Sequence, residues 1–225
     1  MRIRFFIDVE VSVNSSINAV LVFVLLLNLF LLGTSRIRAL IHGAALQGVL
    51  LSVMPLLVQK HFGMLPLFIA IATLLLKGSV IPSMLLKALR DAKIKREVEP
   101  LIGLVPTMLL GALGTAISIA FASHLAVAPE HADTLIIPAA FSTVLTGFLL
   151  LITRIKAISQ VIGYLILENG IYIFGMLLLE AVPLLVELGI LLDLFVGIFV
   201  VSIIIHHIYR EFASLDTRHL VALKD

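Results

Sequence analysis

Apolar stretches of about 20 residues follow one another along almost the whole of this 225-residue chain. A helix of about 20 mostly apolar residues is long enough to cross the hydrocarbon core of a bilayer. We therefore expect an all-α, polytopic membrane protein of about seven transmembrane helices, with a tilt or kink at Pro82 in the third. The predicted spans are Val13–Gly33, Ala39–Val58, Met64–Leu89, Leu101–Val127, Leu135–Ile152, Ala157–Leu179 and Leu184–Ile208.

Composition supports this fold class and excludes several functions. Hydrophobic residues make up 61% of the chain and charged residues 13%, whereas soluble domains are near half apolar and a quarter charged. No basic face alternates with aromatic residues, so nucleic-acid binding is not expected. The chain has no cysteine, which excludes disulfides and cysteine-ligated iron–sulfur or nickel centres within it. The histidines form no clear haem-ligating pair, so we expect no cofactor, no metal and no redox centre in this chain.

The basic residues predict how the chain is oriented. They concentrate in the connections after the first, third, fifth and seventh predicted spans, as Arg36 and Arg38, then the run from Lys87 to Arg96, then Arg154 and Lys156, then Arg210 and Arg218. Because basic connections stay in the cytoplasm, we expect the N-terminus outside and the C-terminus inside. Arg2 and Arg4 argue weakly against this orientation.

Two segments of the chain are similar to each other. Leu29–Leu40 (LFLLGTSRIRAL) matches Gly147–Ile158 (GFLLLITRIKAI) at an offset of 118 residues. This match predicts parallel repeats, although apolar bias alone can produce part of it. The predicted organisation is a first three-helix repeat in residues 1–90, a connecting helix with its flanking loops in 91–134, a second three-helix repeat in 135–209 and a cytoplasmic tail in 210–225. Small residues recur on one stripe of the connecting helix, which favours close packing between helices.

Glu168 is the first candidate for function inside the membrane. It lies twelve residues beyond Lys156, about 18 Å along a helix and so near the middle of the bilayer. Tyr164 and Tyr172 lie one turn to either side of it on the same stripe. Intramembrane acids mark ion paths by default, so we expect these three side chains to form a proton path. The alternative is a single protonated acid that holds two helices together.

Three further ionisable residues lie within predicted spans. Asp193, flanked by Gly189 and Gly197, lies at similar depth in the seventh span, and Glu187 lies nearer its outer end. Lys77 lies in the third span and requires an acid or a water-filled cavity beside it. For Lys77 and Glu187, a role in the ion path and a structural role are both open.

The segment Gly163–Ile171 (GYLILENGI), followed by Asp193–Ile198 (DLFVGI), resembles the E component of hydrogenase-4. That family comprises membrane subunits of complex-I-like hydrogenase and formate hydrogenlyase assemblies. The C-terminal half is also similar to the K-type subunit of complex I and to the C-type subunit of multi-subunit Na+/H+ antiporters. These are three-helix proteins with a basic loop after the first helix and one buried acid in each of the next two. Asp193 departs from the K-type pattern, which has a glutamate in the third helix.

The resemblance implies a non-catalytic membrane subunit of a hydrogenase-type complex in a bacterial or archaeal plasma membrane. Its implied partners are other membrane subunits, including antiporter-like ones, and a peripheral redox arm on the cytoplasmic side. Glu168 and Asp193 would then belong to a lateral path for protons or sodium ions. The alternatives are a purely structural anchor subunit of the same complex and a subunit of a cation/proton antiporter.

Overall fold

The computed structural model describes residues 2–58, 64–91, 100–125 and 134–178, with single helical residues at 189, 192 and 202. All regular elements in these ranges are helical, as the sequence predicts. Six helical segments are long and apolar enough to cross a membrane: Val13–Gly33, Ile37–Val58, Leu67–Arg90, Leu104–Ala122, Ile136–Thr153 and Ala157–Leu178. The seventh predicted span, Leu184–Ile208, and the predicted tail lie outside the described residues.

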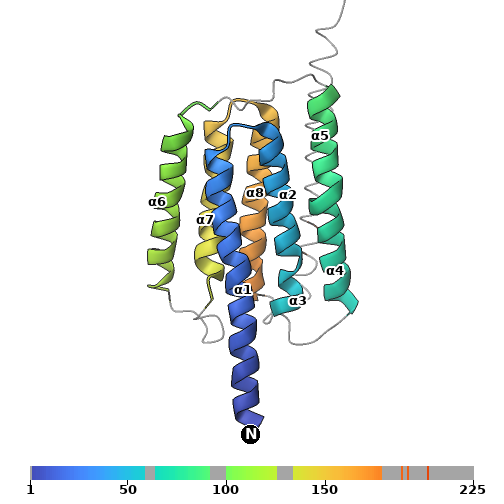
Figure 1. Ribbon diagram of the computed structural model, residues 1–225, viewed down its shortest axis with the longest axis vertical. Helices are drawn as coiled ribbons and strands as arrows, with labels where there is room; N and C mark the ends of the chain where they lie inside the picture. Colours follow the sequence, from blue (N-terminus) through green and yellow to red (C-terminus); the bar gives the residue numbers. More distant parts are fainter. Residues whose placement is uncertain are drawn as a thin grey trace, which may run out of the picture.

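The helices run alternately up and down (Figure 1). Helix α1 (Arg2–Gly33) extends beyond one end of the bundle and lies across the face that Figure 1 presents, in front of α7 and α8. It packs against α2 (Ile37–Ser52), α6 (Leu104–Ala122) and α7 (Ile136–Thr153). Helix α8 (Ala157–Gly175), followed by the short turn η3 (Met176–Leu178), packs against α7 and α2. This arrangement surrounds the middle of α8 with other helices.

Two of the spans are interrupted just before a proline. The second span divides into α2 and α3 (Met54–Val58), with Pro55 in the first turn of α3. The third divides into α4 (Met64–Leu75), the π-helical turn η1 (Leu76–Val80) and α5 (Ile81–Asp91). Proline lacks a backbone N–H, and its ring displaces the carbonyl four residues earlier. For Pro82 that carbonyl belongs to Gly78, so the distortion falls inside η1. This is one turn before Pro82, the residue at which the sequence predicts the kink.

Helices α7 and α8 approach each other through glycines. A Cβ atom on Gly147 would lie 2.5 Å from the backbone nitrogen of Leu167, and one on Gly170 would lie 2.6 Å from that of Val144. Only glycine permits backbones to come this close. The contact fixes the middle of α8, where Glu168 lies, against α7.

Arg36 and Arg154, which match in the predicted repeat, both lie in short connections between antiparallel helices. Their backbone angles are similar, with φ −104° and ψ 119° at Arg36 and φ −107° and ψ 132° at Arg154. Their side chains differ, because Arg36 is exposed and Arg154 is buried. Arg154 Nη2 donates a hydrogen bond to the Leu32 carbonyl at 2.7 Å, where the last turn of α1 leaves carbonyl groups without helical partners. The repeat as a whole stays a prediction.

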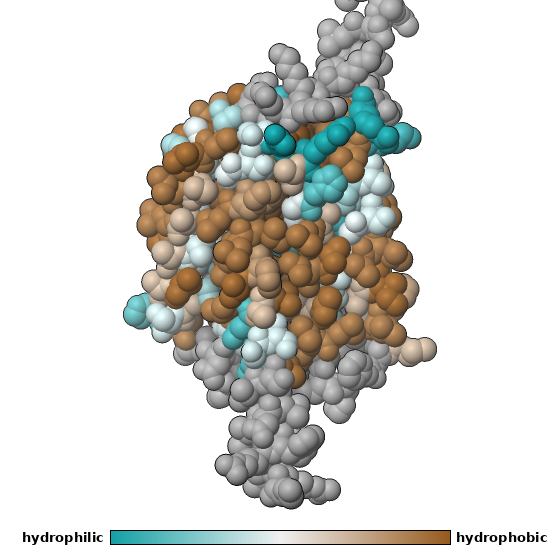
Figure 2. Space-filling view, viewed as in Figure 1, coloured by the Kyte–Doolittle hydropathy of each residue, from teal (hydrophilic) through white to brown (hydrophobic). Residues whose placement is uncertain are grey.

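The outer surface of the bundle is largely apolar (Figure 2). Large hydrophobic side chains on the outer helices are half or more exposed, among them Phe23, Leu109 and Ile152 at 60%, 62% and 64%. Soluble monomers rarely expose continuous apolar surface of this kind, whereas a lipid bilayer covers it. The chain is a multi-pass membrane protein.

Candidate functional site

The centre of the bundle contains a buried ion pair. The ammonium of Lys77 in η1 lies 2.8 Å from Oε1 of Glu168 in α8. Lys77 is 7% exposed and Glu168 is 2% exposed. Both lie close to the middle of their spans, Leu67–Arg90 and Ala157–Leu178. The pair therefore joins two helices that are distant in sequence, at the depth where an unpaired charge is most costly.

The local structure around Lys77 brings its side chain inward. A π turn widens the helix by one residue and often occurs at functional sites, and Lys77 is the second residue of η1. On the facing helix, a Cβ atom on Gly48 would lie only 2.6 Å from the Lys77 Cβ. The absence of a side chain at Gly48 lets η1 approach α2, and the lysine then reaches α8.

A row of buried amides continues from the ion pair. The Lys77 ammonium donates to Asn169 Oδ1 at 2.9 Å. Asn169 Nδ2 donates to Gln47 Oε1 at 3.1 Å, and Gln47 Nε2 donates to Asn28 Oδ1 at 2.9 Å. Asn28 Nδ2 then donates to the hydroxyl of Thr143 at 2.9 Å. We call Asn169, Gln47, Asn28 and the terminal Thr143 the amide row. They lie on α8, α2, α1 and α7 in that order, and each is at most 2% exposed.

The amide row has one direction. An ammonium group can only donate, so Asn169 turns its oxygen toward Lys77 and its NH₂ group toward the next amide. At the other end, Thr143 donates to the backbone carbonyl of Ala139 at 2.7 Å, and a carbonyl can only accept. Every bond between these ends therefore has its donor on the lysine side. Aligned hydrogen bonds of this kind polarise one another and disperse the charge of the ammonium.

Several polar atoms beside the ion pair have no hydrogen-bond partner among the described residues. They are Glu168 Oε2, the Tyr172 hydroxyl and the Thr73 hydroxyl. The Tyr172 hydroxyl lies beside Thr73 without the geometry of a hydrogen bond, and the Lys77 ammonium lies 5.4 Å from the centre of the Tyr172 ring. A cation at this distance from an aromatic face is stabilised by it. The free carboxylate oxygen can accept a proton or a hydrogen bond from a group that enters the site.

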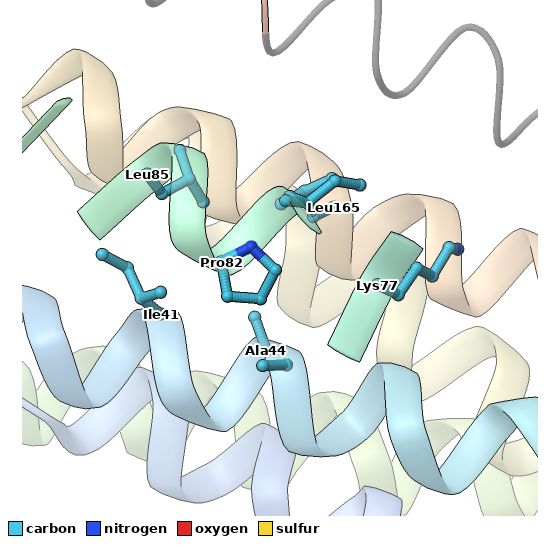
Figure 3. A pocket seen from close by; sticks show the side chains of 8 residues that line it. Ile41, Ala44, Lys77, Pro82, Leu85 and Leu165 are labelled. Carbon is cyan, nitrogen blue, oxygen red and sulfur yellow. The ribbon is translucent and has the colours of Figure 1, made fainter. Parts of the chain in front are cut away.

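A small cavity lies beside Lys77, between α2, α5 and α8 (Figure 3). Its other lining residues are Ile41, Ala44, Ala45, Ile81, Pro82, Leu85 and Leu165. A buried water molecule needs two to four polar partners, and this lining offers almost none. The Lys77 nitrogen points away from Pro82 in Figure 3. The ammonium is therefore stabilised by Glu168 and Asn169 rather than by this cavity.

The structure brings together three of the residues singled out from the sequence. Glu168, Lys77 and Tyr172 meet at one point, whereas Tyr164, one turn along α8, is half-buried and packs against an apolar cluster. Asp193 and Glu187 lie outside the described residues. Asn28, Asn169 and Thr143 carry the amide row and were not singled out, although an amide within a run such as VLLLNLFLL is a visible signal.

No group of three or more histidine, cysteine, aspartate or glutamate side chains that could hold a metal ion occurs in the described ranges. The charged side chains that meet inside the bundle are those of Glu168 and Lys77. Outside the spans, burial lowers the pKa of Arg154, from an ordinary value so high that the group remains charged.

The chain is similar to "Uncharacterized protein Rv0085" of Mycobacterium tuberculosis, with 32% identity over 192 residues, which cover 84% of this chain and 87% of that protein. The chain belongs to the family of this mycobacterial protein. No protein-family model matches the chain, and no solved structure matches it.

The chain has a shorter similarity to a second group of proteins. The chain is 34% identical to hydrogenase-4 component E of Escherichia coli over 80 residues, and equally so to the protein of that name in Shigella flexneri. The aligned segment covers 36% of this chain and 37% of each of these proteins. The resemblance to hydrogenase-4 component E predicted from the sequence is thus confirmed over about a third of the chain.

Proposed function

We propose that the chain is a membrane subunit of a complex-I-like hydrogenase or formate hydrogenlyase-type assembly, in which it contributes to a lateral path for protons or sodium ions. The observation that carries the proposal is the ion pair of Lys77 and Glu168 at the middle of the bundle, 2.8 Å apart and almost fully buried. The partial similarity to hydrogenase-4 component E supports the type of assembly. Other membrane subunits, antiporter-like ones among them, and a peripheral redox arm would be its partners.

In this proposal the titratable groups and the amides have different tasks. Glu168 has a carboxylate oxygen without a hydrogen-bond partner among the described residues, where it can take up a proton. Protonation would weaken the ion pair and leave the Lys77 ammonium to the amide row, and release of the proton would restore it. Amides do not titrate near neutral pH, so they position Lys77 rather than carry charge.

Four further residues belong to the proposed path. Tyr172 contacts the ammonium through its ring, and Tyr164 lies one turn along α8 toward the end that carries Arg154. Asp193 and Glu187 would supply acids from the seventh predicted span. We propose that the basic end of the bundle faces the cytoplasm of a bacterium or archaeon, which places the redox arm at that end.

The test compares two variants in the assembled complex, reconstituted into proteoliposomes. Glu168→Gln removes the charge of the acid and preserves its shape. Ser142→Ala is the matched control, because it removes the 2.7 Å bond between Ser142 and Thr115 that joins α7 to α6 and does not touch the ion pair. We expect Glu168→Gln to lower the number of ions moved per electron pair transferred, and Ser142→Ala to leave it unchanged.

Normal coupling in a fully assembled Glu168→Gln complex would refute the ion path. A purely structural subunit would instead show reduced assembly with normal turnover and coupling in each complex that does assemble. Purification of the native protein with its bound subunits distinguishes a hydrogenase-type complex from an antiporter. Only the hydrogenase-type complex would bring a redox arm with it, whether the subunit carries ions or is purely structural.

A further inference from the structure

A basic pocket lies at one end of the bundle, away from the ion pair. It opens between the first turns of α2 and one side of α5, and its lining residues are Arg38, His42, Ser83, Leu86 and Arg90. Arg38, His42 and Arg90 are exposed, and none of the five lining residues is acidic. Figure 2 shows hydrophilic residues gathered at this end of the molecule, at the top of the view.

The pocket lies at the level of the lipid headgroups. Arg38 is the second residue of the span Ile37–Val58, and Arg90 is the last residue of the span Leu67–Arg90. His42 lies one turn below Arg38, about 6 Å deeper, and its Nδ1 bonds to the Arg38 carbonyl at 2.6 Å. Since a carbonyl only accepts, Nδ1 carries the hydrogen and is engaged within α2, so the two arginines are the groups available to an anion.

Below the basic residues the same helix faces become apolar. On α2, Leu46 lies one turn beyond His42 and is 50% exposed, and Val80 at the end of η1 is 38% exposed. Leu86 lines the pocket one turn below Arg90. Positive charge at the rim with apolar surface beneath it fits an amphiphile with an anionic head and hydrocarbon chains.

We propose that this pocket binds the phosphate headgroup of an anionic phospholipid. Arg38 and Arg90, from two different helices, hold the phosphate, since guanidinium groups match phosphate oxygens in pairs. The acyl chains lie along Leu46 and Val80. Basic pockets between transmembrane helices at the cytoplasmic side are suited to such headgroups, and binding here would join α2 to α5, both of which contact η1.

The experiment uses the full-length protein in detergent micelles, with phosphatidylglycerol as the probe and phosphatidylcholine as the neutral comparison. Native mass spectrometry measures how much lipid stays bound. We expect the doubly substituted variant Arg38→Gln/Arg90→Gln to bind phosphatidylglycerol about tenfold or more weakly, because both guanidinium groups that pair with the phosphate oxygens are lost. The control variant Lys87→Gln removes an exposed charge on α5 that does not line the pocket, and it should bind like the native protein.

Equal binding of phosphatidylglycerol by the double variant and the native protein would overturn the proposal. So would a similar loss in Lys87→Gln, which would indicate attraction by overall charge. A further measurement adds inorganic phosphate to the lipid-bound protein. Displacement of the lipid by millimolar phosphate would overturn the proposal, because it would assign the pocket to a free anion. Unchanged circular dichroism of the variants shows that the helices are intact.

Discussion

At the scale of single residues, the central question is why a membrane helix contains a lysine. A buried cation is stable only when neighbouring groups replace the water it has lost. Lys77 has three such neighbours, namely the Glu168 carboxylate, the Asn169 oxygen and the Tyr172 ring. Each compensates part of the lost hydration. The pair is therefore strongly coupled, and loss of either charge leaves the other one without its partner.

This coupling predicts a non-additive result in a double-mutant cycle. Glu168→Gln or Lys77→Met alone should destabilise the protein by about 3–5 kcal/mol, the range for loss of one partner of a buried ion pair. The combined variant should be more stable than the sum of the two losses by about 1 kcal/mol or more. Unfolding in mixed micelles with increasing denaturing detergent measures each free energy.

Asn28→Ala extends the test to the amide row, since it shortens the row without contacting either charge. Its effect should add to that of Lys77→Met only in part, because the row ends on the ammonium. Strict additivity of Glu168→Gln and Lys77→Met would contradict the ion pair.

The sequence identified the two deep charges but not their partnership. Glu168 and Lys77 are visible because charges are rare in apolar runs, whereas their contact depends on which helices lie side by side. In the sequence Tyr164 and Tyr172 lie on one stripe of α8 and are equivalent candidates. In the structure Tyr172 faces Lys77 and Tyr164 packs against apolar side chains, because the lysine enters from η1 on one side only.

At the scale of helices, the π turn η1 and Gly48 act together. The π turn places Lys77 on the inner face, and Gly48 makes room for its first carbon atom. The sequence predicted a tilt or kink at Pro82, and the structure has the interruption one turn earlier, since a proline distorts the turn that precedes it.

Gly48→Ala should displace Lys77 and weaken the ion pair. The new Cβ would lie 2.6 Å from the Lys77 Cβ, so η1 must move away from α2, at a cost of about 1–3 kcal/mol for overpacking. The same detergent titration measures this loss. Gly114→Ala is the matched control, because its Cβ would meet Leu145 at ordinary contact distances, 3.4 Å from Cδ1 and 4.0 Å from Cβ.

If Gly48→Ala acts through Lys77, its effect should largely disappear when Lys77 is replaced by glycine in the same chain. An equal loss of stability from Gly48→Ala in the native chain and in the Lys77→Gly chain would contradict this prediction. It would show that the added methyl group does not act through the Lys77 side chain.

At the scale of the whole molecule, the alternating helices gather the basic connections at one end. Arg36, Lys87 and Lys156 are far apart in sequence, and all three lie where spans end or begin on the same side of the bundle (Figure 1). The apolar runs predicted six spans to within a few residues, since length and hydropathy determine them. How α7 packs against α8 depends on glycine contacts at Gly147 and Gly170, and hydropathy carries no information about such pairs.

The proposed orientation predicts which residues can be labelled from outside the cell. The native chain has no cysteine, so a single introduced thiol is the only one to react. Ser35 is exposed beside Arg36, and Met64 is 88% exposed at the opposite end of the bundle. With the basic end in the cytoplasm, a membrane-impermeant maleimide should label Met64→Cys in intact cells and Ser35→Cys only after permeabilisation. Phe23→Cys, in mid-span and facing lipid, should react in neither case.

Labelling of Ser35→Cys from outside would reverse the orientation, and labelling of both ends from one side would contradict the alternating helices themselves.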